Sequence, residues 1–463
     1  MDAALLHHRR QSRWKPQRQP FGSQCPETDD FWFRVERLQV DLSQSAALYP
    51  TVLIAESDPI QFLAAFVAAV CQGCPVVLGN PGWRAAEWQA VLAQVHPDYC
   101  VGTVPEVAPR LQKDVARPQP GWILIPTGGS SGQIRFVIHT WDRLMVATQG
   151  FHEYFLGSLK AGWQPIHCCC VLPLYHVSGL MQFVRSFVSG GQLAIAPFTE
   201  IMTHHIPVIE PQISFLSLVP TQLHRLLSEV TLQNWLCQFQ TVFLGGGPAW
   251  GALLQTARQQ GIRLAPTYGM TETAAQVATL KPEDFLAGHN HCGTPLPHVQ
   301  LYIQDDQGQP LETDQVGRIA IGSAALCQGY YPAFAPPPSI WVTDDRGFLS
   351  ATGALQVVGR SSRKIISGGE NIYPEEIEAA LYATGWVQDV YVMGLPDPDW
   401  GEVVTAFYVP LDPTLTSTQL ATALQDHLSR YKHPKRWIPL TMIPRNAQGK
   451  LSRLDRLLAL TNL

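Results

Sequence analysis

The chain has 463 residues, of which 46% are hydrophobic and 15% charged, and its formal net charge is −5 at pH 7. One hydrophobic core stops growing at roughly 250–300 residues, so this composition predicts a globular protein of two or more domains. The negative charge gives no bulk attraction to nucleic acid or to anionic membranes. The longest apolar run, residues 62–70, is too short for stable insertion into a bilayer.

The cysteines and the N-terminus indicate the compartment. Residues 168–170 are three adjacent cysteines, whose side chains on a strand would point to alternate faces and could not clip one metal ion. Cys71 and Cys74 form the only C-x-x-C spacing, with no second pair to complete a zinc site. The basic stretch over residues 7–18 lacks the apolar segment of a signal peptide, and we expect a charged, solvated tail there. These features predict reduced, mostly buried thiols in a cytoplasmic protein.

Strand and helix patterns alternate through the first half of the chain. Short apolar runs predict strands over residues 52–55, 75–78, 122–126, 168–172, 192–196, 213–219 and 241–244. Helical periodicity predicts helices over residues 60–71, 180–189 and 220–228. Strands that alternate with helices favour parallel sheets, and we expect two doubly wound α/β subdomains.

The pattern changes in the second half. Residues 293–322 predict a small antiparallel β region with a turn at Gln307-Gly308, and a proline-rich loop follows. After Gly359 the elements expected are a helix from Glu375-Glu376, strands over residues 387–393 and 403–409, and a helix near residues 420–429. The prediction is therefore an α/β protein with a large N-terminal domain over residues 1–361 and a small α+β domain over residues 362–463.

Two glycine-rich segments follow predicted strands. The loop of Thr127, Gly128, Gly129, Ser130, Ser131 and Gly132 comes directly after a strand. Such a loop can approach a phosphate closely and donate amides and hydroxyls to it, although most loops of this composition are ordinary turns. It is not a Walker A loop, because no Gly-Lys-Ser/Thr follows. Gly246 and Gly247 follow the strand over residues 241–244, where a flat ring could lie against backbone.

Further polar residues complete a possible nucleotide site. In the run Tyr268-Gly269-Met270-Thr271-Glu272, a hydroxyl adjoins a carboxylate, which can serve a phosphate and a Mg²⁺ ion together. Asp345, with Arg360 later in the chain, could hold the two hydroxyls of a ribose. Lys450 lies in a polar segment near the C-terminus. Each feature alone has an ordinary structural explanation, such as a helix cap, a turn or a surface lysine.

The order of these motifs resembles the acyl-adenylate-forming enzymes, which include acyl- and aryl-CoA ligases, nonribosomal adenylation domains and luciferases. The likeness extends from about residue 53 to residue 450 and is most specific at residues 268–272, 367–376 and 444–450. Within this superfamily the chain is most similar to the o-succinylbenzoate–CoA ligases of menaquinone or phylloquinone synthesis. That similarity rests on residues 172–180, 219–223 and 365–374.

The resemblance implies an acid–thiol ligase that works in two steps. A carboxylate, o-succinylbenzoate by this resemblance, attacks the α-phosphate of ATP and gives an acyl-adenylate and pyrophosphate. CoA thiolate then attacks the acyl carbon, and AMP leaves. The implied cofactors are ATP and Mg²⁺, with CoA as co-substrate, and oligomers are possible. No protein nucleophile is needed, so catalysis would rest on positioning and electrostatics.

By matched position, the resemblance also implies roles for the phosphate-binding residues. Residues 127–132 would hold the β- and γ-phosphates of ATP. Thr271 would contact the α-phosphate, and Glu272 would bind Mg²⁺. Lys450 would neutralise the charge that develops on the α-phosphate and acyl oxygens, and the C-terminal domain would then rotate to remove it.

The remaining roles concern the nucleoside and the acid. Gly246, Gly247 and Tyr268 would pack on adenine, while Asp345 and Arg360 would bind the ribose. For the acid, His176 resembles a gate residue and Gly269 would line the pocket. o-Succinylbenzoate carries a second carboxylate, and Arg185, nine residues after His176, is the candidate donor to it.

Three positions depart from the family pattern. The phosphate loop usually continues Gly-x-Pro-Lys-Gly, whereas this chain has Gln133-Ile134-Arg135-Phe136 after the last loop glycine, so Arg135 is not expected to copy the lysine. The usual Thr-Gly-Asp is Thr343-Asp344-Asp345, and we assign the ribose to Asp345 by register. At the hinge, Ser362 replaces the common Asp or Lys, which bears on the rate of domain rotation.

Three alternatives stay open at this point. One is a CoA ligase for another aryl or medium-chain acid. Another is a stand-alone adenylation domain that loads a carrier protein, although no phosphopantetheine carrier motif follows. The third is a regulatory protein that binds a nucleotide without turnover, which only the altered phosphate loop favours.

Overall fold

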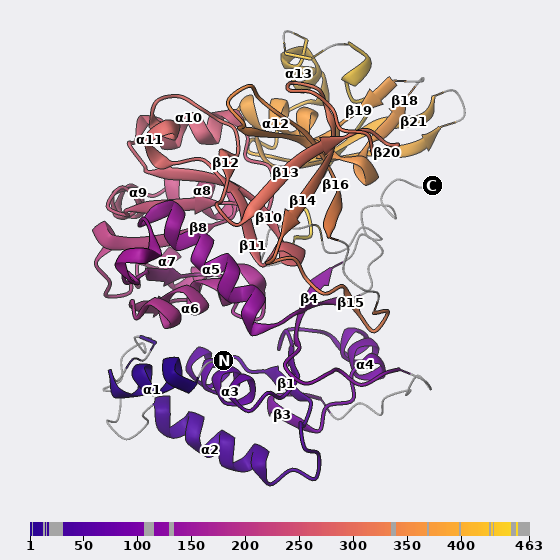
Figure 1. Ribbon diagram of the computed structural model, residues 1–463. Coiled ribbons are helices and arrows are strands. Elements are labelled where there is room, and N and C mark those ends of the chain that lie inside the picture. Colours follow the sequence, from indigo (N-terminus) through magenta and orange to yellow (C-terminus); the bar gives the residue numbers. More distant parts are fainter. Residues whose placement is uncertain are drawn as a thin grey trace.

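The structure is a computed structural model that describes residues 1, 3–12, 14, 16–17, 31–105, 115–128, 134–334, 339–367, 370–397, 400–425, 427–428, 430–445 and 451. The described residues form four sheets that follow one another along the molecule, with the N-terminal sheet at one end and the C-terminal sheet at the other (Figure 1). Among these residues, no helix has the length and apolar character that a membrane crossing requires.

The first sheet has the strand order β15-β5-β4-β2-β1-β3. Its strands are β1 (Val52–Ala55), β2 (Val76–Leu78), β3 (Tyr99–Gly102), β4 (Ile123–Gly128), β5 (Ile134–His139) and β15 (Tyr330–Tyr331). The first four strands run parallel, whereas β4 and β5 form an antiparallel hairpin to which β15 adds. The helices of this part are α2 (Phe31–Ser43), α3 (Pro59–Cys71) and α4 (Ala85–Gln94). Helix α3 starts where the Asp58 carboxylate accepts the backbone N–H of Ile60 at 3.0 Å.

The second sheet has the order β12-β11-β10-β9-β8-β6-β7. Its strands are β6 (His167–Cys170), β7 (Leu193–Ile195), β8 (Ser214–Leu218), β9 (Thr241–Leu244), β10 (Leu264–Met270), β11 (Ala275–Thr279) and β12 (Thr294–Pro295). The β7-β6-β8-β9-β10 part is parallel, and the last two strands are antiparallel. Its helices are α5 (Trp141–Phe155), α6 (Val177–Ser189), α7 (Phe198–Met202), α8 (Pro220–Leu227), α9 (Val230–Leu236), α10 (Gly251–Gln259) and α11 (Pro282–Leu286).

Apolar cores lie on both faces of the second sheet. One core joins α5 and α6 with α2 and α3, and so packs the first two sheets together. The other core covers the opposite face with side chains from α8 to α11. Cys168 and Cys170 belong to the first core and Cys169 to the second. The predicted alternation of these cysteines is therefore confirmed.

The remaining sheets are small. The antiparallel third sheet, in the order β13-β14-β16-β17, consists of β13 (Val299–Gln304), β14 (Gly317–Ser323), β16 (Ile340–Leu349) and β17 (Leu355–Arg360). The predicted turn contains Gly308, whose φ of 85° favours glycine. The C-terminal elements are β18 (Ile365–Ser367), β19 (Glu370–Ile372), α12 (Pro374–Ala383), β20 (Val387–Asp397), β21 (Gly401–Pro410), α13 (Ser417–Ala423) and β22 (Arg436–Pro439). They enclose a core of their own.

The helix predicted near residues 420–429 is displaced toward the N-terminus. It begins at Ser417 because Thr416 caps it, accepting the backbone N–H of Gln419 at 3.3 Å. It ends at Ala423. The prediction of a helix in this region is right, but its start was placed too late because the capping role of Thr416 was not recognised.

The solvated tail expected at the N-terminus is wrong for the described residues. Helix α1 (Ala3–Gln11) leads to Trp14, whose indole N–H donates to the Gly191 carbonyl at 2.7 Å. The Trp14 ring is only 7% exposed and lies edge-on to Phe183 and Phe187 of α6. The charged residues around Trp14 suggested an exposed segment. The sequence does not show that Trp14 is buried, because the residues it packs against lie far along the chain.

This anchor predicts an asymmetric effect of two aromatic substitutions. Trp14→Ala should lower the free energy of unfolding by about 3–5 kcal/mol, the usual effect of removing a large buried aromatic side chain. Phe33→Ala, at a position 58% exposed on α2, should change it by less than about 0.5 kcal/mol. Urea unfolding of both variants is the measurement. If both variants change the free energy of unfolding by a similar small amount, the N-terminal segment does not anchor the fold and the solvated-tail prediction is right.

Candidate active site

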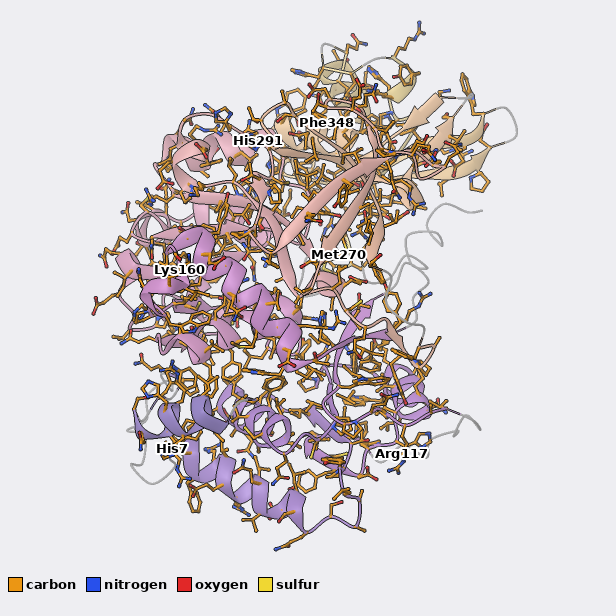
Figure 2. All side chains as sticks on the ribbon, in the orientation of Figure 1. His7, Arg117, Lys160, Met270, His291 and Phe348 are labelled. Atoms are coloured by element: carbon orange, nitrogen blue, oxygen red, sulfur yellow. The ribbon has the colours of Figure 1, made fainter. Side chains whose placement is uncertain are left out.

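The run Tyr268–Glu272 lies at the end of β10, where the chain turns sharply into β11. Figure 2 shows Met270, the last residue of β10, in the middle of the molecule. A Cβ atom on Gly269 would lie 1.9 Å from the Ala275 carbonyl oxygen, so only glycine permits this close approach of the two strands. Ala274 closes the turn with a φ of 54°. Gly269 thus has a backbone role, and its contact with the acid stays a prediction.

The first sheet holds this turn in place. His139, the last residue of β5, is fully buried, and its Nε2–H donates to the Thr271 carbonyl at 2.7 Å. The Tyr330 hydroxyl on β15 donates to Glu272 Oε1 at 2.6 Å, and the Cys327 backbone N–H donates to the Glu272 carbonyl at 2.7 Å. Burial, with the Glu272 charge, raises the pKa of Tyr330, so its hydroxyl keeps its proton. The Glu272 carboxylate is therefore oriented before any ligand binds.

Tyr268, predicted to pack on adenine, meets the predicted ribose residues Asp345 and Arg360 at the Asp345 carboxylate. The Tyr268 hydroxyl donates to Asp345 Oδ2 at 2.7 Å, and Arg360 Nε donates to Asp345 Oδ1 at 2.8 Å. Asp345 is 6% exposed, whereas Asp344 points outward. Because side chains alternate along a strand, the register of β16 turns Asp345 inward. Burial, with the Asp345 charge, raises the pKa of Tyr268 well above its usual value, so this hydroxyl also remains a donor.

The glycines after β9 stand at the carboxyl edge of the second sheet. Gly246 has a φ of 82°, which favours glycine. A Cβ atom on Gly247 would meet no atom within 4 Å, so packing does not demand glycine there. An open backbone at the carboxyl edge of a parallel sheet is the usual place for a ligand.

The phosphate loop is described only at its start. Thr127 and Gly128 are the last residues of β4, and Thr127 pairs with Arg135 across the β4–β5 hairpin. The predicted residues Gly129, Ser130, Ser131 and Gly132 lie outside the described part of the chain, as does Lys450. The Arg135 guanidinium is 6.0 Å from the centre of the Tyr330 ring. The loop thus begins beside the side chains that orient Glu272.

The comparisons with known proteins decide the family. Residues 107–331 match the AMP-binding enzyme family, and residues 376–450 match the AMP-binding enzyme C-terminal domain. A 2-succinylbenzoate–CoA ligase from Enterococcus faecalis is 33% identical over 333 residues, which cover 71% of this chain and 67% of that protein. The chain belongs to the AMP-binding enzymes. The family predicted from the sequence is confirmed.

Other relatives of this AMP-binding enzyme carry the same name. The 2-succinylbenzoate–CoA ligase of Bacillus pumilus is 32% identical over 77% of this chain and 73% of its own length. That of Oceanobacillus iheyensis is 35% identical over 61% of this chain. The match with this last protein covers 59% of it, which is less than two thirds of its length.

Solved structures share the fold. The o-succinylbenzoate CoA synthetase of Bacillus subtilis in complex with the acyl-adenylate intermediate OSB-AMP superposes with a TM-score of 0.80 at 23% identity, covering 98% of this chain and 97% of that one. ATP-bound MatB from Rhodopseudomonas palustris gives a TM-score of 0.77 at 21% identity, covering 93% and 92%. The predicted fold class is confirmed.

The two residues predicted to contact the acid lie at the start of one helix and along it. His176 is the N-cap residue of α6, and its ring lies beside that of Tyr175 with centres 4.5 Å apart. Arg185 is on the same helix, buried, with its guanidinium carbon 3.9 Å from the centre of the Phe151 ring on α5. Their placement on one helix agrees with the expectation, and their contacts with substrate stay predictions.

Sequence reasoning missed His139 and Tyr330. Each contacts the 271–272 turn from strands that are distant in the chain. The available signals were weak: a histidine directly after the apolar residues 136–138, where no strand was predicted, and a Tyr-Tyr pair before a proline-rich loop. The local sequence around His139 and Tyr330 does not predict that they contact the 271–272 turn.

The buried His139 predicts a pH-dependent stability. Burial lowers its pKa from 6.5 to about 4, and the hydrogen bond to Thr271 only partly offsets that. Above pH 6.5 the ring is neutral in both the folded and unfolded states. As the pH falls from 6.5 toward 4, only the unfolded state binds the proton, so stability falls.

The test compares urea unfolding of the native chain and of His139→Gln between pH 7 and pH 4.5. Gln keeps a donor for the Thr271 carbonyl and does not titrate. The native chain should lose about 2 kcal/mol more stability than the variant over this range. Exposed His8→Gln on α1 is the control and should follow the native chain. Parallel curves for the native chain and His139→Gln would show that His139 is not held neutral.

Proposed function

We propose that this protein is an AMP-forming CoA ligase that converts o-succinylbenzoate, ATP and CoA to o-succinylbenzoyl-CoA, AMP and pyrophosphate. The supporting observation is its identity of about one third with curated 2-succinylbenzoate–CoA ligases over most of the chain. The hydrogen bonds of Tyr268 and Arg360 to the Asp345 carboxylate support a nucleotide site like the one the family resemblance implies. A cytoplasmic location belongs to the proposal, since all nine cysteines in the described residues are free thiols.

The site residues would bind ATP as follows. Asp345 accepts the ribose hydroxyls while Arg360 holds that carboxylate in place. Gly246, Gly247 and the Tyr268 ring form the adenine surface. The loop over residues 127–132 donates to the β- and γ-phosphates, and the Thr271 hydroxyl donates to the α-phosphate.

The residues also suit Mg²⁺. Tyr330 binds Glu272 Oε1, which leaves Oε2 for a cation. Among the described residues, no three His, Cys, Asp or Glu side chains form a metal cluster. One protein carboxylate plus phosphate oxygens is the usual way Mg²⁺ is held. When bound, the ion would neutralise phosphate charge, while Glu272 and Tyr330 fix where it sits.

The proposal divides the chain at residues 361 and 362. Residues 1–361 bind ATP and the acid, and residues 362–463 form a mobile domain that carries Lys450. The separate core of the C-terminal elements supports this division. The two parts touch where the Tyr382 ring of α12 stacks on Trp250, which precedes α10, with ring centres 4.1 Å apart. Rotation of the domain would break this stack.

The experiment that tests the function is AMP release with Mg-ATP, CoA and a panel of carboxylic acids. CoA-dependent release should be strongest with o-succinylbenzoate. Release that is strongest with another aryl or medium-chain acid would keep the reaction and replace the substrate. Thioester formation on a carrier protein but not on CoA would identify an adenylation domain instead. ATP binding without AMP release from any acid would favour the regulatory nucleotide binder.

The role of Lys450 predicts a split between the two half-reactions. Lys450→Ala should slow acyl-adenylate formation by at least about 10²-fold, because a charge on the developing transition state is lost. Thioester formation from supplied acyl-adenylate and CoA should persist. Pyrophosphate release and thioester formation measure the two steps, and exposed Lys160→Ala is the control. Equal loss of both steps would contradict the domain rotation.

A further inference from the structure

An ion pair binds the side chain of Arg445 to the start of strand β20. Its Nε donates to Asp389 Oδ2 at 2.8 Å, and its Nη2 donates to Asp389 Oδ1 at 2.8 Å. Nη2 also donates to the Val390 carbonyl at 2.9 Å. The side chains of Arg445 and Asp389 are only 21% and 19% exposed. A two-pronged pair that is mostly shielded from water fixes the relative position of the segments that carry it.

A β-bulge and a tyrosine orient the Asp389 carboxylate. The pairing register between β20 and β21 shifts between Val387 and Asp389, and such a bulge changes the direction of the side chains next to it. The Tyr382 hydroxyl of α12 donates to Asp389 Oδ1 at 2.7 Å. Burial, and then the Asp389 charge, raise the pKa of Tyr382, so its hydroxyl stays a donor. Both the strand and the neighbouring helix therefore direct this carboxylate.

The same tyrosine belongs to the contact between the two domains. Tyr382 and Ala379 of α12 pack against the core of α8 to α11. The planes of the Tyr382 and Trp250 rings are only 15° apart. One side chain thus touches the large domain with its ring and Asp389 with its hydroxyl. The ion pair of Arg445 and Asp389 is therefore one hydrogen bond away from the contact that a domain rotation would break.

Arg445 also lies at one end of the segment that contains Lys450. The backbone of Arg445 pairs with Leu451 across an antiparallel bridge. Lys450 is the residue before Leu451 and lies outside the described part of the chain. Both ends of the segment are thus held at one point, and Asp389 fixes that point to β20. So short a segment cannot carry Lys450 far from this point.

We propose that Arg445 and Asp389 are positioning residues for adenylate formation, because their ion pair holds the segment that carries Lys450. Tyr382 joins this ion pair to the domain contact. The inference rests on the proposed function, which gives Lys450 its role, and it extends that role to residues that touch no substrate. A displaced charge stabilises the transition state poorly, and a shift of about 1 Å can lower a rate about 100-fold.

The test measures Arg445→Met in the two half-reactions. The kcat for pyrophosphate release, the step in which Lys450 acts, should fall by about 10- to 100-fold. The KM values for ATP and the acid should change by less than about 3-fold, because residues 1–361 bind both. Thioester formation from supplied acyl-adenylate and CoA should persist, which also shows that the variant is folded. Exposed Arg430→Met in the same domain is the matched control and should alter neither step.

Two further variants separate positioning from a general structural role. If Arg445 acts only through Lys450, adding Arg445→Met to Lys450→Ala should slow pyrophosphate release no further. Arg445→Lys keeps the charge but not the fork, so its loss should be smaller than that of Arg445→Met. An additional loss in the double variant would overturn the proposal. Equal loss of both half-reactions in Arg445→Met, or an unchanged kcat for pyrophosphate release, would also overturn it.

Failure of the proposed function gives a different result. The native chain would then release no pyrophosphate with any acid of the panel. Hydrogen–deuterium exchange over residues 446–451 decides the proposal in that case, with Asp389→Asn as the variant because it leaves their sequence unchanged. Exchange at least about 10-fold faster than in the native chain would support the ion pair as the element that holds this segment, and equal exchange would overturn it. Exposed Asp412→Asn is the control and should exchange like the native chain.

Discussion

The hydrogen bonds from the first sheet to the 271–272 turn are the constraint on which the site depends. His139 and Tyr330 come from adjacent strands, β5 and β15, and bind the Thr271 carbonyl and the Glu272 carboxylate. The turn belongs to the second sheet, so these bonds also fix how the two sheets meet. Both donors are held in their neutral forms by burial, which keeps the bonds intact across the neutral pH range. The phosphate loop begins on β4, the partner of β5, and so shares this frame.

Much of the fold could be predicted because its strands are short, apolar and bounded by turn residues. The alternation of Cys168, Cys169 and Cys170 between two cores shows that period-two reasoning holds within a buried parallel strand. The larger error lies where the determining contact is distant in the sequence. Trp14 is buried by α6 residues about 170 positions away, and no local pattern distinguishes it from a tryptophan in a polar tail. The α13 boundary depended on a single capping hydroxyl.

In the candidate site, too, some residues could be predicted from the sequence and others could not. From the order of the motifs, the sequence predicted that Tyr268, Asp345 and Arg360 belong to one site, and their side chains do lie together. The register of the strand shows that Asp345, and not Asp344, faces that site. The supporting residues His139 and Tyr330 could not be predicted, because their roles arise from strand neighbours that only the three-dimensional fold defines. Residues that touch ligands recur in recognisable motifs, whereas those that orient them are specified by packing.

Helix α6 carries buried polar atoms that have no partner in the described structure. Arg185, His298 and Gln182 have buried atoms without partners, and Arg185 and Gln182 stand three residues apart on α6. A buried polar group without a partner destabilises the folded chain, so packing elsewhere must compensate for it. The main stabilising core surrounds the same helix, with Phe183 and Phe187 fully buried. Helix α6 can therefore tolerate an uncompensated charge on one turn because the adjacent turns pack against aromatic side chains.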